Sequence, residues 1–177
     1  MITQEILNEY FGTTWNAAAE DWECTGLALL DIIPMDAKIL DVGCGYNIFK
    51  EHFTNIIGID PANDNADVVT TIEDYETDKK FDVALLLGSI NFGSKEKITN
   101  QVEKIVSLME DESEIIWRCN PGYYDHDNDE CHILDFYPWT FNEMEEFAKS
   151  FNYNIVTMKM EKHLDHGRER LFSHWKK

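Results

Sequence analysis

Two acidic residues and two glycines, placed after two short apolar segments, are the residues of this chain best suited to chemistry. The first segment ends near Asp41 and continues into Gly43 and Gly45. Glycine has no Cβ atom, so a turn of this kind lets the backbone lie close to a ligand. The next apolar segment ends in Asp60, whose carboxylate can accept hydrogen bonds from both hydroxyls of a ribose. The spacing therefore predicts a site for a nucleotide-like ligand.

This order of residues resembles the class I S-adenosylmethionine-dependent methyltransferases. In that family the first strand ends in an acid followed by three alternating glycines, and the second strand ends in an acid. Asn47 stands in the place of the third glycine, and asparagine tolerates a positive φ better than most residues. The resemblance implies S-adenosylmethionine as the cofactor. It assigns the methionine end, the ribose and the adenine to the following residues: Asp41, Gly43, Cys44, Gly45, Asp60, Pro61, Ile72, Glu73 and Gly88.

Two other readings of the glycine turn stay open. A nicotinamide-type dinucleotide site requires G-x-G-x-x-G at the start of a helix, but Ile48 occupies the third glycine position. The glycines could also form a tight turn without any ligand, although Asp60 at the end of the second apolar segment disfavours that reading.

The methyl acceptor is expected between the segments 88–93 and 119–135, because ligands of open α/β sheets bind beyond the carboxyl ends of the strands. The predicted acceptor-binding residues are Asn91, Arg118 and Asn120, and the predicted catalytic residues are Tyr123 and His126. Arg118 could bind a carboxylate of the acceptor or pair with a nearby acid. Tyr123 or Tyr124 would stack on the acceptor, and His126 or a carboxylate of the same loop would take a proton near neutral pH.

Residues 120–132 allow further readings. The tetrad that begins at Asn120 resembles the N/D-P-P-Y/F motif of amine methyltransferases, but it follows the fifth predicted strand instead of the fourth and is also typical of a Pro-Gly turn. The loop 123–132 could be a solvated acidic loop. A zinc site from His126, Cys131 and His132 lacks a recognised spacing, so no metal is predicted.

Composition narrows the class of partner. The 177 residues carry a formal net charge of −19, which repels phosphate backbones and disfavours free nucleic acid. No stretch of 18 apolar residues and no secretion signal are recognisable. The four cysteines form no C-x-x-C pair, which is typical of free thiols in a reducing compartment. We therefore expect a cytoplasmic protein with a small-molecule acceptor and no membrane contact, in an oligomeric state that the sequence leaves open.

The element pattern predicts a single methyltransferase-like domain over residues 1–177. An N-terminal helical lid segment over 1–35 would precede a Rossmann-like core over 36–177. The expected fold is α/β, with a doubly wound, mostly parallel seven-stranded sheet. The predicted strands are 38–42, 55–59, 67–71, 81–87, 114–119, 153–161 and 169–175, and the last is expected to be antiparallel from the family resemblance. The predicted helices are 3–33 with a break at 12–14, 47–53, 72–77, 95–110 and 141–150.

Within the N-terminal segment, Trp15 and Trp22 lie seven residues apart. They could form part of a lid over the cofactor or pack in the core. The family resemblance implies a methyltransferase, and we expect it to act on a small molecule. The alternative is a non-catalytic protein that binds the cofactor and serves as an interaction or regulatory subunit.

Overall fold

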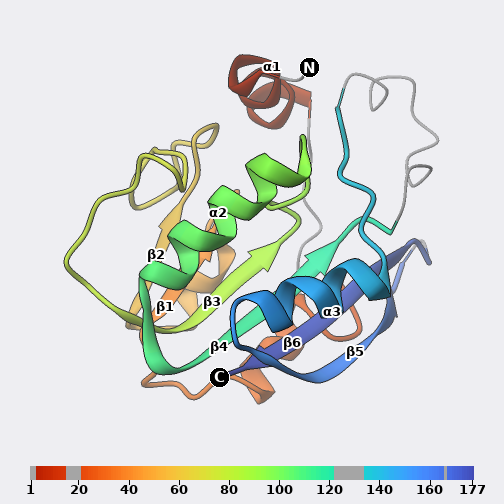
Figure 1. The fold of residues 1–177 in the computed structure, drawn as a ribbon. Coiled ribbons are helices and arrows are strands. Elements are labelled where there is room, and N and C mark those ends of the chain that lie inside the picture. Colours follow the sequence, from red (N-terminus) through yellow and green to blue (C-terminus); the bar gives the residue numbers. More distant parts are fainter. Residues whose placement is uncertain (1–2, 15–20, 122–133, 166) are drawn as a thin grey trace.

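A mixed six-stranded sheet forms the centre of the computed structural model, which describes residues 3–14, 21–121, 134–165 and 167–177 (Figure 1). Its order among these residues is β2-β1-β3-β4-β6-β5. The strands are β1 (Ile39–Val42), β2 (Ile56–Ile59), β3 (Phe81–Leu87), β4 (Met109–Cys119), β5 (Asn154–Lys162) and β6 (Glu169–Lys176). The first four pair in parallel, and β6 is antiparallel to both β4 and β5. The predicted antiparallel last strand is therefore confirmed.

The prediction of a seven-stranded, mostly parallel sheet is wrong, because residues 67–71 form no strand. Only an isolated bridge links Ile59 to Val68. The side chain of Asp67 explains the difference, since its Oδ2 atom accepts the Gly58 N–H at 2.9 Å. A side-chain oxygen thus takes the amide that a strand added at this edge of the sheet would use.

Two helices cover one face of the sheet and lie in front of it in Figure 1. They are α2 (Lys95–Ser107) and α3 (Phe141–Ser150). Each begins at a hydroxyl that accepts a backbone N–H of the first turn, from Ser94 for α2 and from Thr140 for α3. Both helices were predicted, although α2 ends before residue 110 because β4 begins at Met109.

Shorter elements cover the opposite face. The 3-10 helices Gly26–Asp31 and Ile48–Glu51 contribute Leu29 and Phe49 to its apolar layer. The predicted helix 47–53 is thus only one 3-10 turn, and the predicted helix 72–77 is reduced to a turn at 72–74, closed by one hydrogen bond from the Tyr75 amide to the Ile72 carbonyl.

The N-terminal segment begins with α1 (Gln4–Glu9), which continues into a π-helical turn, Tyr10–Thr14. In Figure 1, α1 lies beyond the end of the sheet toward which the arrow of β3 points. The predicted helix over 3–33 is therefore only partly present, and Trp15 lies outside the described residues. No helix in the described ranges is both long enough and apolar enough to cross a membrane.

Candidate active site

The glycine turn after β1 depends on left-handed backbone conformations. Gly43, Gly45 and Asn47 have φ values of 70°, 54° and 57°. The amides of Gly43 and Cys44 donate to the Ile59 carbonyl at 2.8 and 3.1 Å, which ties the turn to the end of β2. A Cβ atom at Gly43 would lie 2.3 Å from the Cβ atom of Ser89, so only glycine fits where the ends of β1 and β3 meet.

Asp60 links this turn to the end of β2. Its Oδ2 atom accepts the Gly45 N–H at 3.0 Å, and its Oδ1 atom accepts the Ala62 N–H at 2.8 Å. Each carboxylate oxygen has two acceptor positions, so both can still accept from a ligand. The side chain is nearly buried at 8% exposure. It therefore has a fixed orientation in the wall of the pocket.

Asn47 lies outside the pocket lining, and its side chain ties the turn to the segment that follows β2. Its Nδ2 atom donates to the Asn65 carbonyl at 3.0 Å. A Cβ atom at Gly58 would lie 2.6 Å from Asn47 Oδ1. Asp67, which holds the Gly58 amide, also forms an ion pair with Lys50 at 2.8 Å. These supporting roles of Gly58 and Asp67 were not predicted from the sequence, because no motif of the family points to them.

Asp41 lies at the end of β1 with a buried carboxyl group. Burial and, to a smaller extent, the negative charge of Asp60 together raise its pKa to about 7, against the opposing effect of Arg118. Burial also raises the pKa of the Cys44 thiol. A nucleophilic thiolate at Cys44 is thereby disfavoured near neutral pH.

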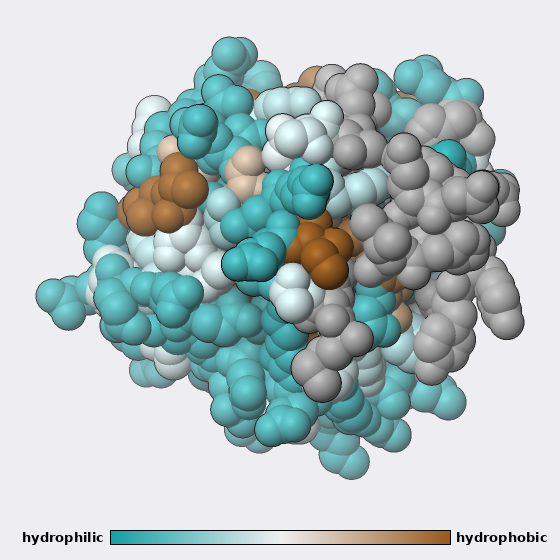
Figure 2. Space-filling model, turned by 90° about the horizontal axis from the view of Figure 1, so that it is seen from above, coloured by the Kyte–Doolittle hydropathy of each residue, from teal (hydrophilic) through white to brown (hydrophobic). Residues whose placement is uncertain are grey.

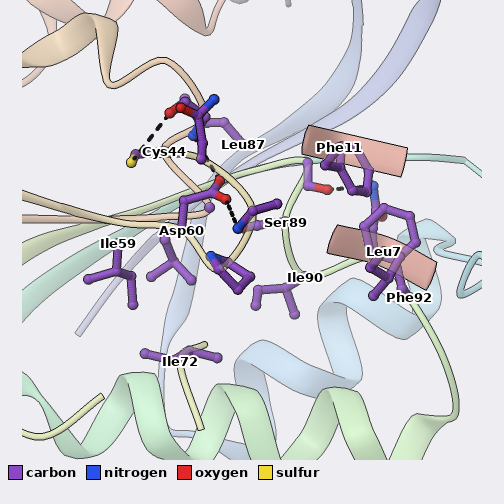
Figure 3. Close-up of a pocket in the computed structure, with 18 of the residues that line it drawn as sticks. Leu7, Phe11, Cys44, Ile59, Asp60, Ile72, Leu87, Ser89, Ile90 and Phe92 are labelled. Carbon is purple, nitrogen blue, oxygen red and sulfur yellow. Dashed lines mark hydrogen bonds between the residues drawn. The ribbon is translucent and has the colours of Figure 1, made fainter. Parts of the chain in front are cut away.

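A single pocket of about 410 Å³ brings the predicted residues together (Figure 3). This volume falls in the usual range for small-molecule sites. Every predicted cofactor- or acceptor-binding residue within the described ranges lines it: Asp41, Gly43, Cys44, Gly45, Asp60, Pro61, Ile72, Glu73, Gly88, Asn91, Arg118 and Asn120. The molecule is seen from the α1 end in Figure 2, where most of the surface is hydrophilic and apolar groups are small and separate.

Two asparagines that line the pocket join the ends of β3 and β4. Asn91 Nδ2 donates to Asn120 Oδ1 at 2.8 Å, and the Asn120 amide donates to Asn91 Oδ1 at 3.1 Å. Both side chains are buried. The paired bonds orient the two amides, so the remaining acceptor and donor positions point in defined directions.

A cluster of apolar side chains, which includes Leu7 of α1, lines one side of the pocket. We call it the aromatic wall, and it consists of Leu7, Tyr10, Phe11, Phe92, Leu134 and Phe136. The ring of Phe92 lies 5.4 Å from that of Phe11 and 5.0 Å from that of Phe136. In Figure 3, Leu7, Phe11 and Phe92 gather on the side of the pocket opposite Cys44. The sequence analysis did not identify this wall, because its members come from three distant segments.

The sequence left open that Arg118 pairs with a nearby acid, but among the described residues Arg118 makes its hydrogen bonds to a hydroxyl and a carbonyl. It donates to Thr25 Oγ1 at 2.9 Å and to the Leu87 carbonyl at 3.1 Å. Its guanidinium carbon lies 4.8 Å from the centre of the Trp22 ring. Trp22 is buried, lines the pocket and bridges to His163 instead of lying on a helix.

The predicted catalytic residues Tyr123 and His126 lie outside the described residues, as do Cys131 and His132 of the possible zinc site. Among the residues that the structure describes, no group of three histidines, cysteines or acids is placed to hold a metal ion.

The fold is similar to that of solved methyltransferase structures, whereas the sequence alone finds no match. The sequence matches no protein-family model and no curated protein. Its structure is similar to 1,6-didemethyltoxoflavin-N1-methyltransferase of Burkholderia thailandensis, which was solved with 1,6-didemethyltoxoflavin and S-adenosylhomocysteine. The TM-score is 0.75 at 15% identity, over 98% of this chain and 88% of that chain.

Two further neighbours have the same fold. Magnesium protoporphyrin IX methyltransferase of Synechocystis, solved with S-adenosylhomocysteine, matches with a TM-score of 0.65 at 11% identity, over 99% of this chain and 100% of that one. A putative methyltransferase of Haloferax volcanii, solved in complex with the Trm112 methyltransferase activator, matches with a TM-score of 0.67 at 12% identity, over 84% and 86% of the two chains. The chain therefore has the class I methyltransferase fold that its glycine turn predicted.

Proposed function

We propose that this protein is an S-adenosylmethionine-dependent methyltransferase that acts on a small molecule. The observation that carries the proposal is the position of Asp60. Its carboxylate lies at the carboxyl end of β2, held by the Gly45 and Ala62 amides, in a pocket that also contains the glycine turn. An acid placed this way suits the two hydroxyls of a ribose.

The residues of the pocket fit this cofactor. Asp41, Gly43 and Gly45 would hold its methionine end, and Ile72 and Glu73 would flank the adenine. Glu73 is held by Gln101 Nε2, which donates to its Oε1 atom at 2.7 Å. A Cβ atom at Gly88 would meet nothing within 4 Å, and Ser89 Oγ is buried without a hydrogen-bond partner among the described residues. The end of β3 thus has both space and an unused polar atom for a ligand.

The acceptor would lie between the asparagine pair and the aromatic wall. The cofactor supplies a methyl group on a positively charged sulfur, and its transfer requires an aligned nucleophile more than elaborate acid–base groups. The Asn91–Asn120 pair would orient a polar group of the acceptor. Leu7 and Phe11 on the α1 side would exclude water. Tyr123 and His126 remain proposed contacts of the acceptor.

A non-catalytic binding or regulatory role is the second candidate. It is favoured by Asn47, which stands where the family has its third glycine. In that case the purified chain would bind the cofactor but would turn over no acceptor, with or without a partner protein.

Isothermal titration with S-adenosylmethionine and S-adenosylhomocysteine tests the proposal. We expect micromolar binding of both and a loss of about tenfold or more in Asp60→Ala. Asp64→Ala is the matched control, because Asp64 is exposed in the same loop and lies outside the pocket lining. Absence of binding to the folded wild-type protein would refute the proposal. Release of S-adenosylhomocysteine from a panel of small-molecule acceptors would then separate an enzyme from a binding protein.

A further inference from the structure

The arginines of this chain are concentrated at one place. The sequence contains three, Arg118, Arg168 and Arg170, and all of them line the pocket. Lys97 is the one lysine that lines it among the described residues. In a chain of net charge −19, the arginine side chains are thus gathered at one pocket, which also contains the carboxyl groups of Asp41, Asp60 and Glu73. We call Trp22 and the three arginines the arginine arm.

Arg118 is the best-defined member of the arginine arm. It is 8% exposed, and its guanidinium group makes two hydrogen bonds, to Thr25 and to Leu87. A guanidinium group has five N–H donors. No carboxylate of the described residues forms an ion pair with it. A buried charge without a charged partner is costly, so an anionic ligand at this point would be bound strongly.

Neither of the two acids that influence the pKa of Arg118 is hydrogen-bonded to it. Glu161 and Asp41 both act on Arg118 through their charge alone. Glu161 accepts the backbone amides of Cys24 and Thr25 at 2.9 and 3.0 Å and the Thr25 hydroxyl at 2.8 Å. Its oxygens therefore serve the N-terminal segment instead of Arg118.

The ring of Trp22 lies against two of the arginines. Its ring centre lies 4.8 Å from the Arg118 guanidinium carbon and 5.4 Å from that of Arg170. The ring of His163 packs edge-on against it at 5.1 Å. Trp22 and Arg170 are buried, at 7% and 8% exposure. Stacking on an aromatic ring orients the guanidinium groups, and arginine forks match the two oxygens of a carboxylate.

The strand order separates Arg170 from the proposed cofactor site. Asp41 belongs to β1, whereas Arg170 belongs to β6, and β3 and β4 lie between them. At about 4.8 Å per strand, Arg170 is roughly 14 Å from β1 across the sheet. A methionine group bound over the glycine turn is too short to occupy this whole region.

We propose that the arginine arm binds a carboxylate of the methyl acceptor, which makes the acceptor an organic acid. This inference rests on the proposed function, because it assumes that a methyl acceptor exists. The other possible source of a carboxylate is the methionine end of the cofactor itself, and the experiment separates the two.

The first arm of the experiment titrates benzoate and indole-3-carboxylate, with their uncharged amides, into protein saturated with S-adenosylhomocysteine. We expect the acids to bind at least about tenfold more tightly than the amides. Arg118→Gln and Arg170→Gln should each weaken binding of the acids by about tenfold, as for loss of a charge-assisted hydrogen bond. Lys149→Gln, the same charge change on an exposed residue outside the pocket lining, should have no effect.

The second arm compares S-adenosylhomocysteine with its decarboxylated analogue in the same variants. Equal effects of the arginine variants on both ligands support the proposal. If Arg118→Gln weakens only the carboxylate-bearing cofactor product, the arginine arm serves the cofactor and the proposal is wrong. It is also wrong if acids and amides bind alike, or if no acid binds at about 10 mM.

Thermal unfolding of each variant shows whether it folds, and Arg118→Lys serves as the conservative replacement for Arg118→Gln. If Arg118→Gln does not fold, the effect of Arg170→Gln, on a different strand, on binding of the acids tests the proposal. Failure of the wild-type protein to bind S-adenosylhomocysteine would refute the proposed function and is measured before either arm begins.

Discussion

Asp60 Oδ2 accepts the backbone N–H of Gly45 at 3.0 Å, so one carboxylate both supports the glycine turn and faces the pocket. The two roles can be separated experimentally, because the turn uses a different acceptor position from the one a ribose would use.

The ribose role predicts an effect that depends on the ligand. Asp60→Asn should weaken binding of S-adenosylhomocysteine by about tenfold or more, since a charged acceptor of hydroxyl groups is lost. It should weaken binding of the 2′-deoxy analogue far less. Isothermal titration of both ligands into both proteins gives the coupling free energy between the Asp60 carboxylate and the 2′-hydroxyl group of the ligand. Equal losses for the two ligands would mean that Asp60 acts through the turn alone.

Gly43 lies at the closest approach between the ends of β1 and β3. Gly43→Ala should lower the free energy of unfolding by more than about 1 kcal/mol, because its φ of 70° disfavours a side chain and its Cβ would overlap Ser89. Adding Ser89→Gly removes the overlap but not the backbone strain, so the double variant should recover only part of the loss. Urea denaturation measures both, and full recovery would show that the backbone conformation is not strained.

Asp41 should make stability depend on pH. Its pKa is raised from 3.8 to about 7 in the folded protein, mainly by burial. Between these values the folded protein holds a proton that the unfolded chain releases, so this contribution to the free energy of unfolding decreases as the pH rises from 3.8 to about 7. Asp41→Asn should remove that decrease, on the order of a few kcal/mol.

Chemical denaturation at about pH 5 and about pH 8 measures the difference between the two proteins. Asp36→Asn, at an exposed position, is the control and should leave the pH dependence unchanged. An unchanged pH dependence in Asp41→Asn would mean that Asp41 is ionised throughout this range.

Glu161 should be important for the N-terminal segment. Glu161→Gln removes the negative charge and replaces one acceptor oxygen by an amide donor, so the charge-assisted bonds from Cys24 and Thr25 are weakened. We expect a loss of about 1–3 kcal/mol in stability and faster hydrogen exchange at the amides of these two residues. Glu169→Gln, an exposed neighbour on β6, should show neither change. Unchanged exchange in Glu161→Gln would mean that the segment is held by other contacts.

The sequence by itself determined the parts that depend on local patterns. Asp41, Gly43, Gly45 and Asp60 could be placed because glycine conformation and strand ends are properties of neighbouring residues. The helices α2 and α3 could be predicted from their apolar spacing and their polar first residues. Asn47 could be expected in a left-handed conformation for the same local reason.

Tertiary structure decided the rest. The third predicted strand did not form, because the Asp67 side chain took the Gly58 amide. Trp22 reached Arg118 and Arg170 because Glu161 on β5 binds residues 24 and 25, which are more than 130 positions earlier in the chain. Contacts of this kind depend on the order of strands in the sheet and on which side chain satisfies each buried polar group. Neither is determined by the spacing of residues along the chain.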